Sequence, residues 1–243
     1  MKRSALVVAA ILASSMWSLP TRAEEAHSHD HAPQSGPAQA GTPAVNAAGS
    51  YDPEKREYRL KLTQAVAPTP GQPAKTPLRI PLRVALFGDN GAKLETRLDG
   101  GAPASDHVLL LDRASHDFVF GGVASPPRAS INRGFSAPIR LTDDMGEKDR
   151  AALAGMDDDA FAQWDALQAI AKAIILDAVR TGARAADANR LDRFVAAVKN
   201  SVTRAADKDP AYAALLLYLP TVGELVLDVK EADPGAIHDV RTQ

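Results

Sequence analysis

The sequence predicts a β-sandwich of about seven strands followed by a partial array of helical hairpins, and three observations support this order. Between residues 51 and 141, apolar and polar residues alternate with the period of two that is typical of half-buried strands. Turn-forming residues separate these segments at intervals of about 8–12 residues, which is typical of a sandwich. From residue 142 onward, apolar residues recur at the three- and four-residue spacing of amphipathic helices.

Two segments precede the predicted sandwich. Residues 1–23 have the features of a signal peptide: a basic start at Lys2 and Arg3, an apolar run over residues 5–19, and a small-residue cleavage site that ends at Ala23. We therefore expect a periplasmic or secreted protein, with no membrane span once the leader is removed. Residues 24–50 are rich in Ala, Pro, Gly and Ser without an apolar period, which predicts a disordered linker.

This linker contains the candidate metal site of the sequence. In the string HSHDH, the imidazoles of His27, His29 and His31 and the carboxylate of Asp30 could bind Zn²⁺, Cu²⁺ or Ni²⁺. The alternative is a solvated linker with adventitious affinity, because no outer residues are visible that would orient the rings. We expect no cofactor elsewhere in the chain.

The first strands of the predicted sandwich cover residues 58–62 and 78–86. Pro81 lies inside the second run, which indicates an edge strand or a bulge. Asn90 and Gly91 then predict a hairpin in which both residues have positive φ. Five further strands are expected near residues 94–98, 108–110, 118–120, 131–135 and 139–141, with Val108 and Leu110 on one apolar face.

Two polar motifs in this domain resemble catalytic motifs, but both favour structural roles. Ser136 in GFSAP is one residue short of the G-x-S-x-G elbow, and Pro138 disfavours the helix that must follow such a serine. We expect a strand that bends at Ala137 and Pro138. The string SHD at residues 115–117 contains the three residue types of a catalytic triad. Consecutive side chains of a strand point to opposite faces, so these three cannot form the hydrogen-bonded relay, and we expect a polar turn that enters the next strand.

Residues 142–243 are expected to form a truncated helical domain. Asp144 and Glu147 have the spacing of a capping box before a short helix. A longer helix is predicted to begin after the acidic run at residues 157–159, which would cap its exposed N–H groups, and to end at Gly182. Further helices are predicted over residues 191–202 and after the start signals at Asp209-Pro210, Thr221 and Asp233-Pro234.

Composition argues against nucleic-acid binding and against stabilisation by disulfides or thiolate metal sites. The formal net charge is −2 and no cluster of Lys and Arg is present, so we expect no nucleic-acid binding. The chain has no cysteine, and it therefore forms neither a disulfide nor a thiolate metal site.

Five separated segments resemble bacterial aminopeptidase N, the alanyl aminopeptidase branch of the zinc gluzincins. They are YRLKLTQAVAPTPGQPAKTPLRIPLRVALFGDNG, HDFVFGGV, RGFSAPIRL, DDAFAQWDALQAIAK and LYLPTVGELVLDVKEADPGAIHDVR. The resemblance implies an Ig-like sandwich and the first helices of a C-terminal helical domain. The family's H-E-x-x-H and G-x-M-E-N motifs do not occur in this sequence, so no catalytic residue of the family can be transferred to it.

Together these observations predict a non-catalytic exported module with a binding or scaffold role, which is not expected to be an enzyme on its own. Exposed apolar surface on the partial helical array would favour self-association or contact with a catalytic aminopeptidase chain. Two alternatives remain open. The chain could be part of a split zinc aminopeptidase that is active only with a separate, zinc-carrying catalytic chain, or it could capture metal through the histidine tract.

Overall fold

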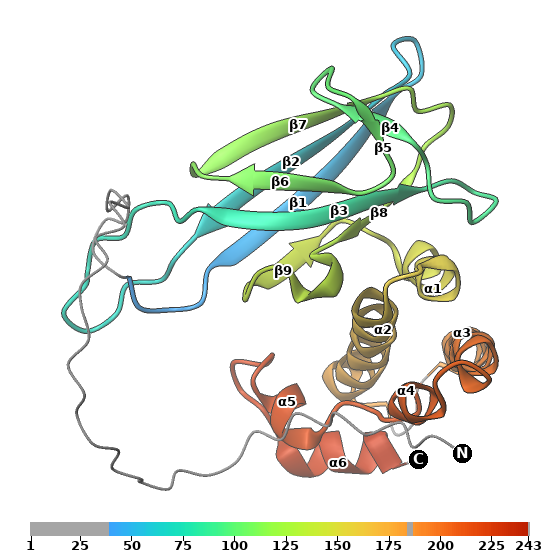
Figure 1. Ribbon diagram of the computed structural model, residues 1–243. Coiled ribbons are helices and arrows are strands. Elements are labelled where there is room, and N and C mark those ends of the chain that lie inside the picture. The colour runs from blue at the N-terminus through green and yellow to red at the C-terminus, as the bar shows by residue number, and fades with distance from the viewer. Residues whose placement is uncertain (1–38, 184–186, 243) are drawn as a thin grey trace, which may run out of the picture. The chain divides into compact units, whose positions relative to one another are not determined.

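The computed structural model describes residues 39–183 and 187–242. In this part of the chain two β-sheets come first and six α-helices follow (Figure 1). The predicted signal peptide and the histidine tract at residues 27–31 lie outside the described residues. Among the helices that are described, none is both long enough and apolar enough to cross a membrane.

The larger sheet has six strands. They are β1 (Ala44–Asp52), β2 (Glu57–Ala65), β4 (Thr96–Leu98), β5 (Pro103–Ala104), β7 (Ser115–Gly121) and β9 (Arg140–Asp143). Their order is β5-β4-β7-β2-β1-β9, and β1 pairs antiparallel with β2 and parallel with β9. In β2 the side chains of Tyr58, Leu60 and Leu62 are buried while the residues between them are exposed, as the period of two predicts.

The smaller sheet has three strands in the order β6-β3-β8, with β3 (Ile80–Phe87) between β6 (His107–Leu111) and β8 (Arg128–Ile131). Apolar side chains of both sheets meet in one buried cluster, which contains Leu60, Leu82, Leu109 and Phe120. The predicted sandwich is thus confirmed. The described residues form nine strands rather than about seven, because β1 and β5 were not predicted.

Strand β1 corrects the predicted linker. Residues 44–50 were expected to be disordered, but they lie between β2 and β9 in the larger sheet. Val45 and Ala47 are buried in the core, and small side chains conceal this alternation in the sequence. Gly49 is required where it stands, because a Cβ at this position would lie 2.1 Å from the hydroxyl of Tyr58.

Strand β6 has the opposite face buried from the one predicted. Val108 and Leu110 are 62% and 37% exposed, whereas His107, Leu109 and Leu111 are buried. The segment HVLLL is apolar on both faces, so periodicity alone does not choose between them. Burial of His107 decides the register, since its Nε2 lies 3.0 Å from Oγ1 of Thr96 and the two atoms share a hydrogen bond.

The predicted hairpin at Asn90 and Gly91 is confined to a short antiparallel turn and does not extend into paired strands. Gly91 has a φ of 78°, but Asn90 is not among the described residues with positive φ. The strands on either side, β3 and β4, enter different sheets. The turn is therefore a connection between the two layers of the sandwich, held by the antiparallel bridge between Phe87 and Lys93 and by hydrogen bonds from the N–H of Leu94 to the carbonyl of Leu86 and from the N–H of Gly88 to the carbonyl of Ala92.

A second connection between the layers replaces the predicted bent strand at residues 131–141. After β8 the chain forms a short 3₁₀ segment, η1 (Arg133–Phe135), and then enters β9 in the other sheet. Asn132 and Gly134 have φ values of 62° and 61°, so the backbone reverses before the expected bend at Pro138. Phe135 was expected on a buried strand face, but it is 53% exposed.

Pro81 occupies a position of β3 that needs no backbone donor. β6 pairs with residues 80–84 of this strand, whereas β8 pairs only with residues 84–87. On the side without a strand, the N–H of Arg83 donates to the hydroxyl of Ser136, and the nitrogen of Pro81 points to the same side. The first half of β3 is therefore an edge, as the proline predicts.

Six α-helices complete the described chain. They are α1 (Glu147–Met156), α2 (Ala160–Thr181), α3 (Ala188–Ala206), α4 (Pro210–Leu215), α5 (Val222–Val226) and α6 (Pro234–Thr242). α2 contacts α1, α3 and α6, and both α1 and α2 contact the end of the smaller sheet, at β8 and η1 (Figure 1). The helical periodicity of the sequence is thus confirmed from Glu147 onward.

Most predicted helix boundaries are confirmed, with one exception. Gly182 ends α2 with a φ of 67°, Asp209 caps α4, and Thr221 forms a reciprocal capping box with Glu224. Asp144 does not cap α1. Its carboxylate accepts a hydrogen bond from the N–H of Gly49 at 3.0 Å, because β9 places it beside β1.

Candidate functional site

The two motifs that resemble catalytic motifs have structural partners. The hydroxyl of Ser136 accepts a hydrogen bond from the N–H of Arg83 at 2.9 Å and donates one to Oδ1 of Asn132 at 3.1 Å. It therefore fastens the crossing segment to the edge of β3. The ring of His116 packs against Phe118, with the ring centroids 4.1 Å apart, so its neighbour on that face is a hydrophobic residue of its own strand.

Arg133 lies at the centre of the junction between the sandwich and the helices. Its side chain is 3% exposed and contacts Asp157 and Asp158, which lie between α1 and α2. Its Nε is 2.9 Å from a carboxylate oxygen of Asp106, although the atoms are not aligned as a hydrogen bond. The guanidinium also lies over the ring of Phe87, 5.7 Å from its centroid. One cation thus joins three acidic residues from two parts of the fold.

The carboxylates around Arg133 differ in their proton affinity. Burial raises the pKa of Asp157 above its ordinary value, and this effect outweighs its hydrogen bonds and its attraction to Arg133. Partial burial also acts to raise the pKa of Asp158, but hydrogen bonds from Lys93 and Arg133 outweigh it and hold the pKa at about 2. Nζ of Lys93 bridges Asp158 and Asp106 at 2.7 and 2.8 Å, which adds a second cation.

Asp159 connects the same junction through the backbone. One oxygen of its carboxylate accepts hydrogen bonds from the N–H of Ala162, in the first turn of α2, and from the N–H of Gly134 in η1. The predicted capping role of the acidic run is therefore confirmed for Asp159. Asp157 and Asp158 are ion-pair partners instead, which the sequence did not show because Arg133 lies more than twenty residues away along the chain.

The Arg133 junction has a structural role. Its acidic and basic groups face one another around the buried Arg133 and Asp157, while Asp158 is partly exposed, so the buried charges are satisfied within the cluster. The arrangement holds the α1–α2 corner against η1 and the end of β3. It fixes the orientation of the first helices on the sandwich.

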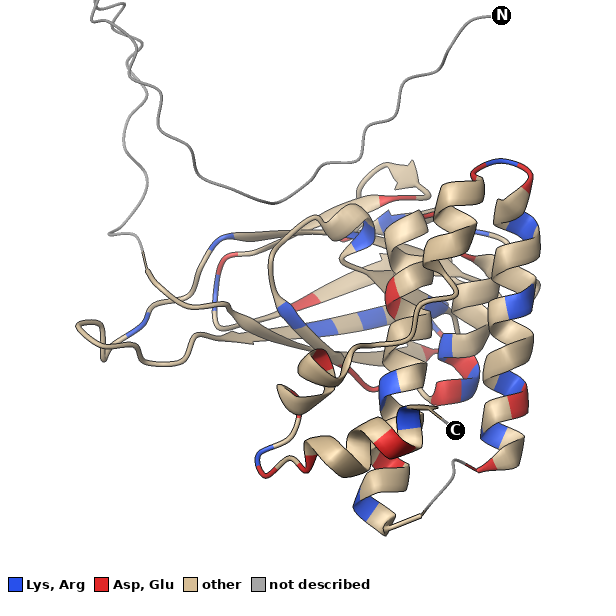
Figure 2. Ribbon diagram, turned by 90° about the horizontal axis from the view of Figure 1, so that it is seen from below, with Lys and Arg blue, Asp and Glu red and all other residues tan. Residues whose placement is uncertain are grey.

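The helical part carries an open apolar groove. This groove, which we call the α3 groove, has a volume of about 370 Å³ and lies between α3 and the chain after α4. Val195 and Leu217 within it are 54% and 62% exposed. Its apolar lining consists of Phe194, Val195, Val198, Val202, Leu216, Leu217 and Leu219. Acidic and basic residues are interspersed over much of the helices (Figure 2), whereas this groove gathers apolar side chains in one place, which suits it to apolar contact.

The residues of this chain do not fit the catalytic zinc of the family that the sequence resembles. Within residues 39–183 and 187–242, no group of three or more His, Cys, Asp or Glu side chains could hold a metal ion. The sequence also lacks H-E-x-x-H, which supplies two zinc ligands one helical turn apart. No catalytic step can be assigned to these residues through zinc.

Comparison with known proteins defines the class of this chain as an Ig-like domain followed by helical repeats. Residues 41–144 match the family described as a domain of unknown function (DUF3458) with an Ig-like fold. Residues 147–243 match its companion family (DUF3458_C), described as ARM repeats. Both matches follow the division between sheets and helices, and the Ig-like fold predicted from the sequence is confirmed.

The chain is similar in sequence to the aminopeptidases N of several bacteria. The chain is 34% identical to aminopeptidase N of Escherichia coli (strain K12) and 31% identical to that of Haemophilus influenzae, in each case over 204 residues. It is 37% identical to aminopeptidase N of Caulobacter vibrioides over 143 residues. The predicted resemblance is therefore confirmed: the described chain is similar to the Ig-like domain and the start of the C-terminal domain of these proteins.

These matches cover most of this chain but a minor part of each relative. The first two cover 84% of this chain and 23% of the relative, and the third covers 59% and 16%. A crystal structure of Legionella pneumophila aminopeptidase A in complex with aspartic acid has the same fold over 84% of this chain and 21% of its own, with a TM-score of 0.67 and 20% identity. The chain thus spans between 16% and 23% of the length of the relatives it matches.

Proposed function

We propose that this chain is a non-catalytic accessory module that binds a protein partner through the α3 groove. The observation that carries this proposal is the exposure of large apolar side chains along the groove, such as Val195 and Leu217. Exposed apolar surface of this kind is costly in water and favours association. The partner is either a second copy of the chain or a separate catalytic aminopeptidase chain.

The buried ionic junction supports the scaffold side of this proposal. Arg133, Asp157 and Asp159 fasten the helices to the sandwich, so the groove is presented in a fixed orientation. A partner that docks on such a surface loses less conformational entropy than one that must order a loose surface. The module would therefore hold its partner rigidly.

Sedimentation of the purified protein over a wide range of concentrations tests the groove. We expect concentration-dependent association, or complex formation when an aminopeptidase N catalytic domain is added. The double variant Val195→Asp/Leu217→Asp should abolish it, because two charges would be buried in an apolar contact. Val108→Asp is the matched control, since Val108 is equally exposed but lies on the sandwich. Association that survives in the groove variant would contradict the proposal.

The non-catalytic part of the proposal has its own test. The purified chain should not hydrolyse alanine p-nitroanilide in the presence of added Zn²⁺, because the sequence contains no H-E-x-x-H. Turnover by the isolated chain would contradict this expectation. Turnover that appears only after a catalytic domain is added would favour the alternative, a part of a split zinc aminopeptidase whose zinc is carried by the other chain.

Export and metal capture are proposed from the sequence of residues 1–50. The leader at residues 1–23 supports a periplasmic or secreted location, which cell fractionation with mass spectrometry of the mature N-terminus would test. The histidine tract supports capture of a metal such as Zn²⁺. Calorimetry should show Zn²⁺ binding that is lost when His27, His29 and His31 are replaced by alanine, and equal binding by both proteins would contradict it.

A further inference from the structure

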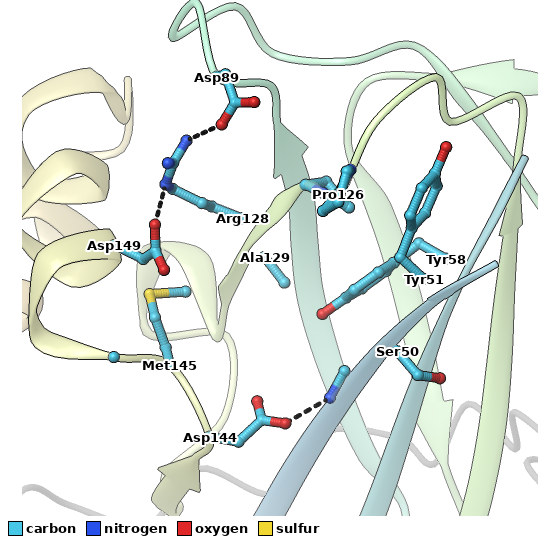
Figure 3. Close-up of a pocket in the computed structure, with 13 residues that line it drawn as sticks. Ser50, Tyr51, Tyr58, Asp89, Pro126, Arg128, Ala129, Asp144, Met145 and Asp149 are labelled. Atoms are coloured by element: carbon cyan, nitrogen blue, oxygen red, sulfur yellow. Dashed lines mark hydrogen bonds and ion pairs between the residues drawn. The ribbon is translucent and has the colours of Figure 1, made fainter. Parts of the chain in front are cut away.

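A polar pocket of about 500 Å³ lies between two parts of the fold (Figure 3). One side is formed by the end of β1 and the start of β2, and the other by the start of α1. The pocket is separate from the α3 groove and from the Arg133 junction. Its lining contains one guanidinium, three carboxylates, a buried tyrosine and Gly49, and these groups come from both sheets and from the first turn of α1. The residues that carry the charge are Asp89, Arg128, Asp144 and Asp149.

The hydroxyl of Tyr58 is a buried donor aimed into this pocket. The residue is 8% exposed, and its ring packs in the sandwich core near Phe120. Its hydroxyl makes no hydrogen bond with any described residue, and Figure 3 shows it pointing toward the side of the pocket where Asp144 and Met145 lie. The hydroxyl of Tyr51, by contrast, donates to the carbonyl of Val123 at 3.2 Å.

This donor is available at ordinary pH and has no acceptor among the residues that the structure describes. Burial, together with the negative charges of Asp144 and Asp143, raises the pKa of Tyr58 far above its ordinary value, so the phenol keeps its proton. The hydroxyl is not one of the fully enclosed polar atoms, so it is reachable from the pocket and can donate to a ligand oxygen placed there. The side chain is held in place because only a glycine at position 49 leaves room for its hydroxyl.

The charges around the pocket favour a cation. Arg128 donates to Asp149 at 2.8 Å and to Asp89 at 3.0 Å, and Asp144 accepts from the N–H of Gly49. The lining therefore holds three carboxylates and one guanidinium, which pairs with two of them, and each carboxylate uses only one of its oxygens in these contacts among the described residues. Among the described residues, these carboxylates do not come together as a cluster of three or more metal ligands. An organic cation fits this arrangement better, because its donors can reach separated oxygens.

We propose that this pocket binds the side chain of a peptide lysine, with the ammonium group on the carboxylates and an amide oxygen on the hydroxyl of Tyr58. Pro126, Pro127 and Met145 supply apolar surface for the carbon chain between these two ends. The site thus requires a positive charge, a short apolar chain and an acceptor oxygen in one ligand. This combination distinguishes it from the apolar contact proposed for the α3 groove.

Titration of the full chain with Nα-acetyl-lysine methylamide, followed by amide chemical shifts in NMR, tests the site. We expect saturable shifts at Gly49 and Gly146, which line the pocket. The norleucine analogue, which lacks the ammonium, should not saturate the site. n-Butylammonium, which lacks the amide, should bind about fivefold more weakly, since it leaves the hydroxyl of Tyr58 unpaired.

Two variants test the assignment of the groups. Tyr58→Phe should weaken binding of the lysine derivative about fivefold while leaving n-butylammonium unaffected. Asp144→Asn should weaken both cations. Tyr51→Phe and Asp117→Asn are matched controls, because neither removes a group that this site uses, and they should bind as the unaltered protein does. Absence of saturable shifts, equal binding of the norleucine analogue, or equal loss in Tyr58→Phe and Tyr51→Phe would overturn the proposal.

Discussion

The sandwich and the helical part bury their apolar residues in different ways. The two sheets face each other and enclose one continuous core, in which Leu60, Leu82 and Phe120 are almost wholly buried. The helices divide their buried residues into smaller clusters and leave several large side chains exposed, including Leu217, Tyr218 and Leu227. The sandwich leaves Val108, Leu110 and Phe135 exposed, whereas the helical part leaves more large side chains exposed, and several of them line the α3 groove that a partner could cover. This difference places the proposed interaction on the helices.

The junction between these two regions differs from both. It is held by Arg133 and its acidic partners together with a small apolar cluster of Ala85, Phe87 and Leu153. Buried ion pairs contribute little net stability but are costly to break on one side only. The relative orientation of sandwich and helices should thus be sensitive to single charge changes that leave each region folded.

Among the changes considered, loss of the Arg133 guanidinium should lower the free energy of unfolding the most. Arg133→Met leaves Asp157 buried without its partner, and we expect the free energy of unfolding to fall by about 3–5 kcal/mol. Denaturation followed by circular dichroism measures this loss. Arg180→Met, which removes an exposed ion pair with Asp177, should cost less than about 1 kcal/mol. Adding Asp157→Asn to Arg133→Met should restore part of the stability; no recovery would mean that the lost apolar packing of Arg133 dominates.

Matched leucine truncations should separate the two ways of burying apolar surface. Leu82→Ala, in the sandwich core, is expected to cost about 2–5 kcal/mol because it leaves a cavity. Leu217→Ala, in the α3 groove, should change stability by less than about 0.5 kcal/mol because its side chain is already exposed. Equal losses in urea denaturation of the two variants would mean that the groove is packed rather than open.

A comparison of two variants that each lose a helix cap should show how strongly the Arg133 junction depends on Asp159. Thr221→Ala removes only the cap of α5 and should cost about 1 kcal/mol. Asp159→Ala removes the cap of α2 and also the hydrogen bond to Gly134, so we expect about 2 kcal/mol. Hydrogen exchange should show faster opening of η1 only in Asp159→Ala. Similar exchange at η1 in both variants would argue against the connection.

The smallest expected effect is a pH dependence at the junction. The pKa of Asp158 is about 2 in the folded protein and 3.8 for the ordinary group, so its contribution to stability is present above about pH 4 and is lost as the pH falls toward 2. Because its side chain is 56% exposed, we expect this contribution to be below about 1 kcal/mol. Thermal unfolding of Asp158→Asn should therefore show a shallower loss between pH 4 and 2. Asp117→Asn, a surface change, should follow the unaltered protein.

Local sequence signals predicted most elements but few of their partners. The strand alternation at Tyr58, Leu60 and Leu62 and the helix ends at Gly182 and Thr221 depend on neighbours within a few residues, and all were predicted. The burial of His107 depends on Thr96 in another strand, and the hairpin at Gly91 stays short because β3 and β4 pair in different sheets. Strand β1 was missed because its small side chains carry almost no periodic signal.

The candidate sites were less predictable than the fold. The acidic run was expected to cap a helix, which only Asp159 does. The sequence gave no signal for the ion pairs of Arg133 or for the pocket beside the hydroxyl of Tyr58, because a charged or aromatic residue beside a strand has many possible surroundings. Their partners lie more than twenty residues away or, for the hydroxyl of Tyr58, are missing among the described residues. Such environments arise only when distant segments are brought together.

The sequence by itself determined the order of sheet and helix, most helix boundaries and the likeness to aminopeptidase N, since periodicity, capping and motif identity are local properties of the chain. Only the tertiary structure decided which face of β6 is buried, that β1 belongs to the sandwich, and that residues 132–139 cross between sheets. It alone brought Arg133 to its three carboxylates and left the hydroxyl of Tyr58 facing a pocket. These features depend on long-range packing, which fixes the environment of each side chain after the local elements have formed.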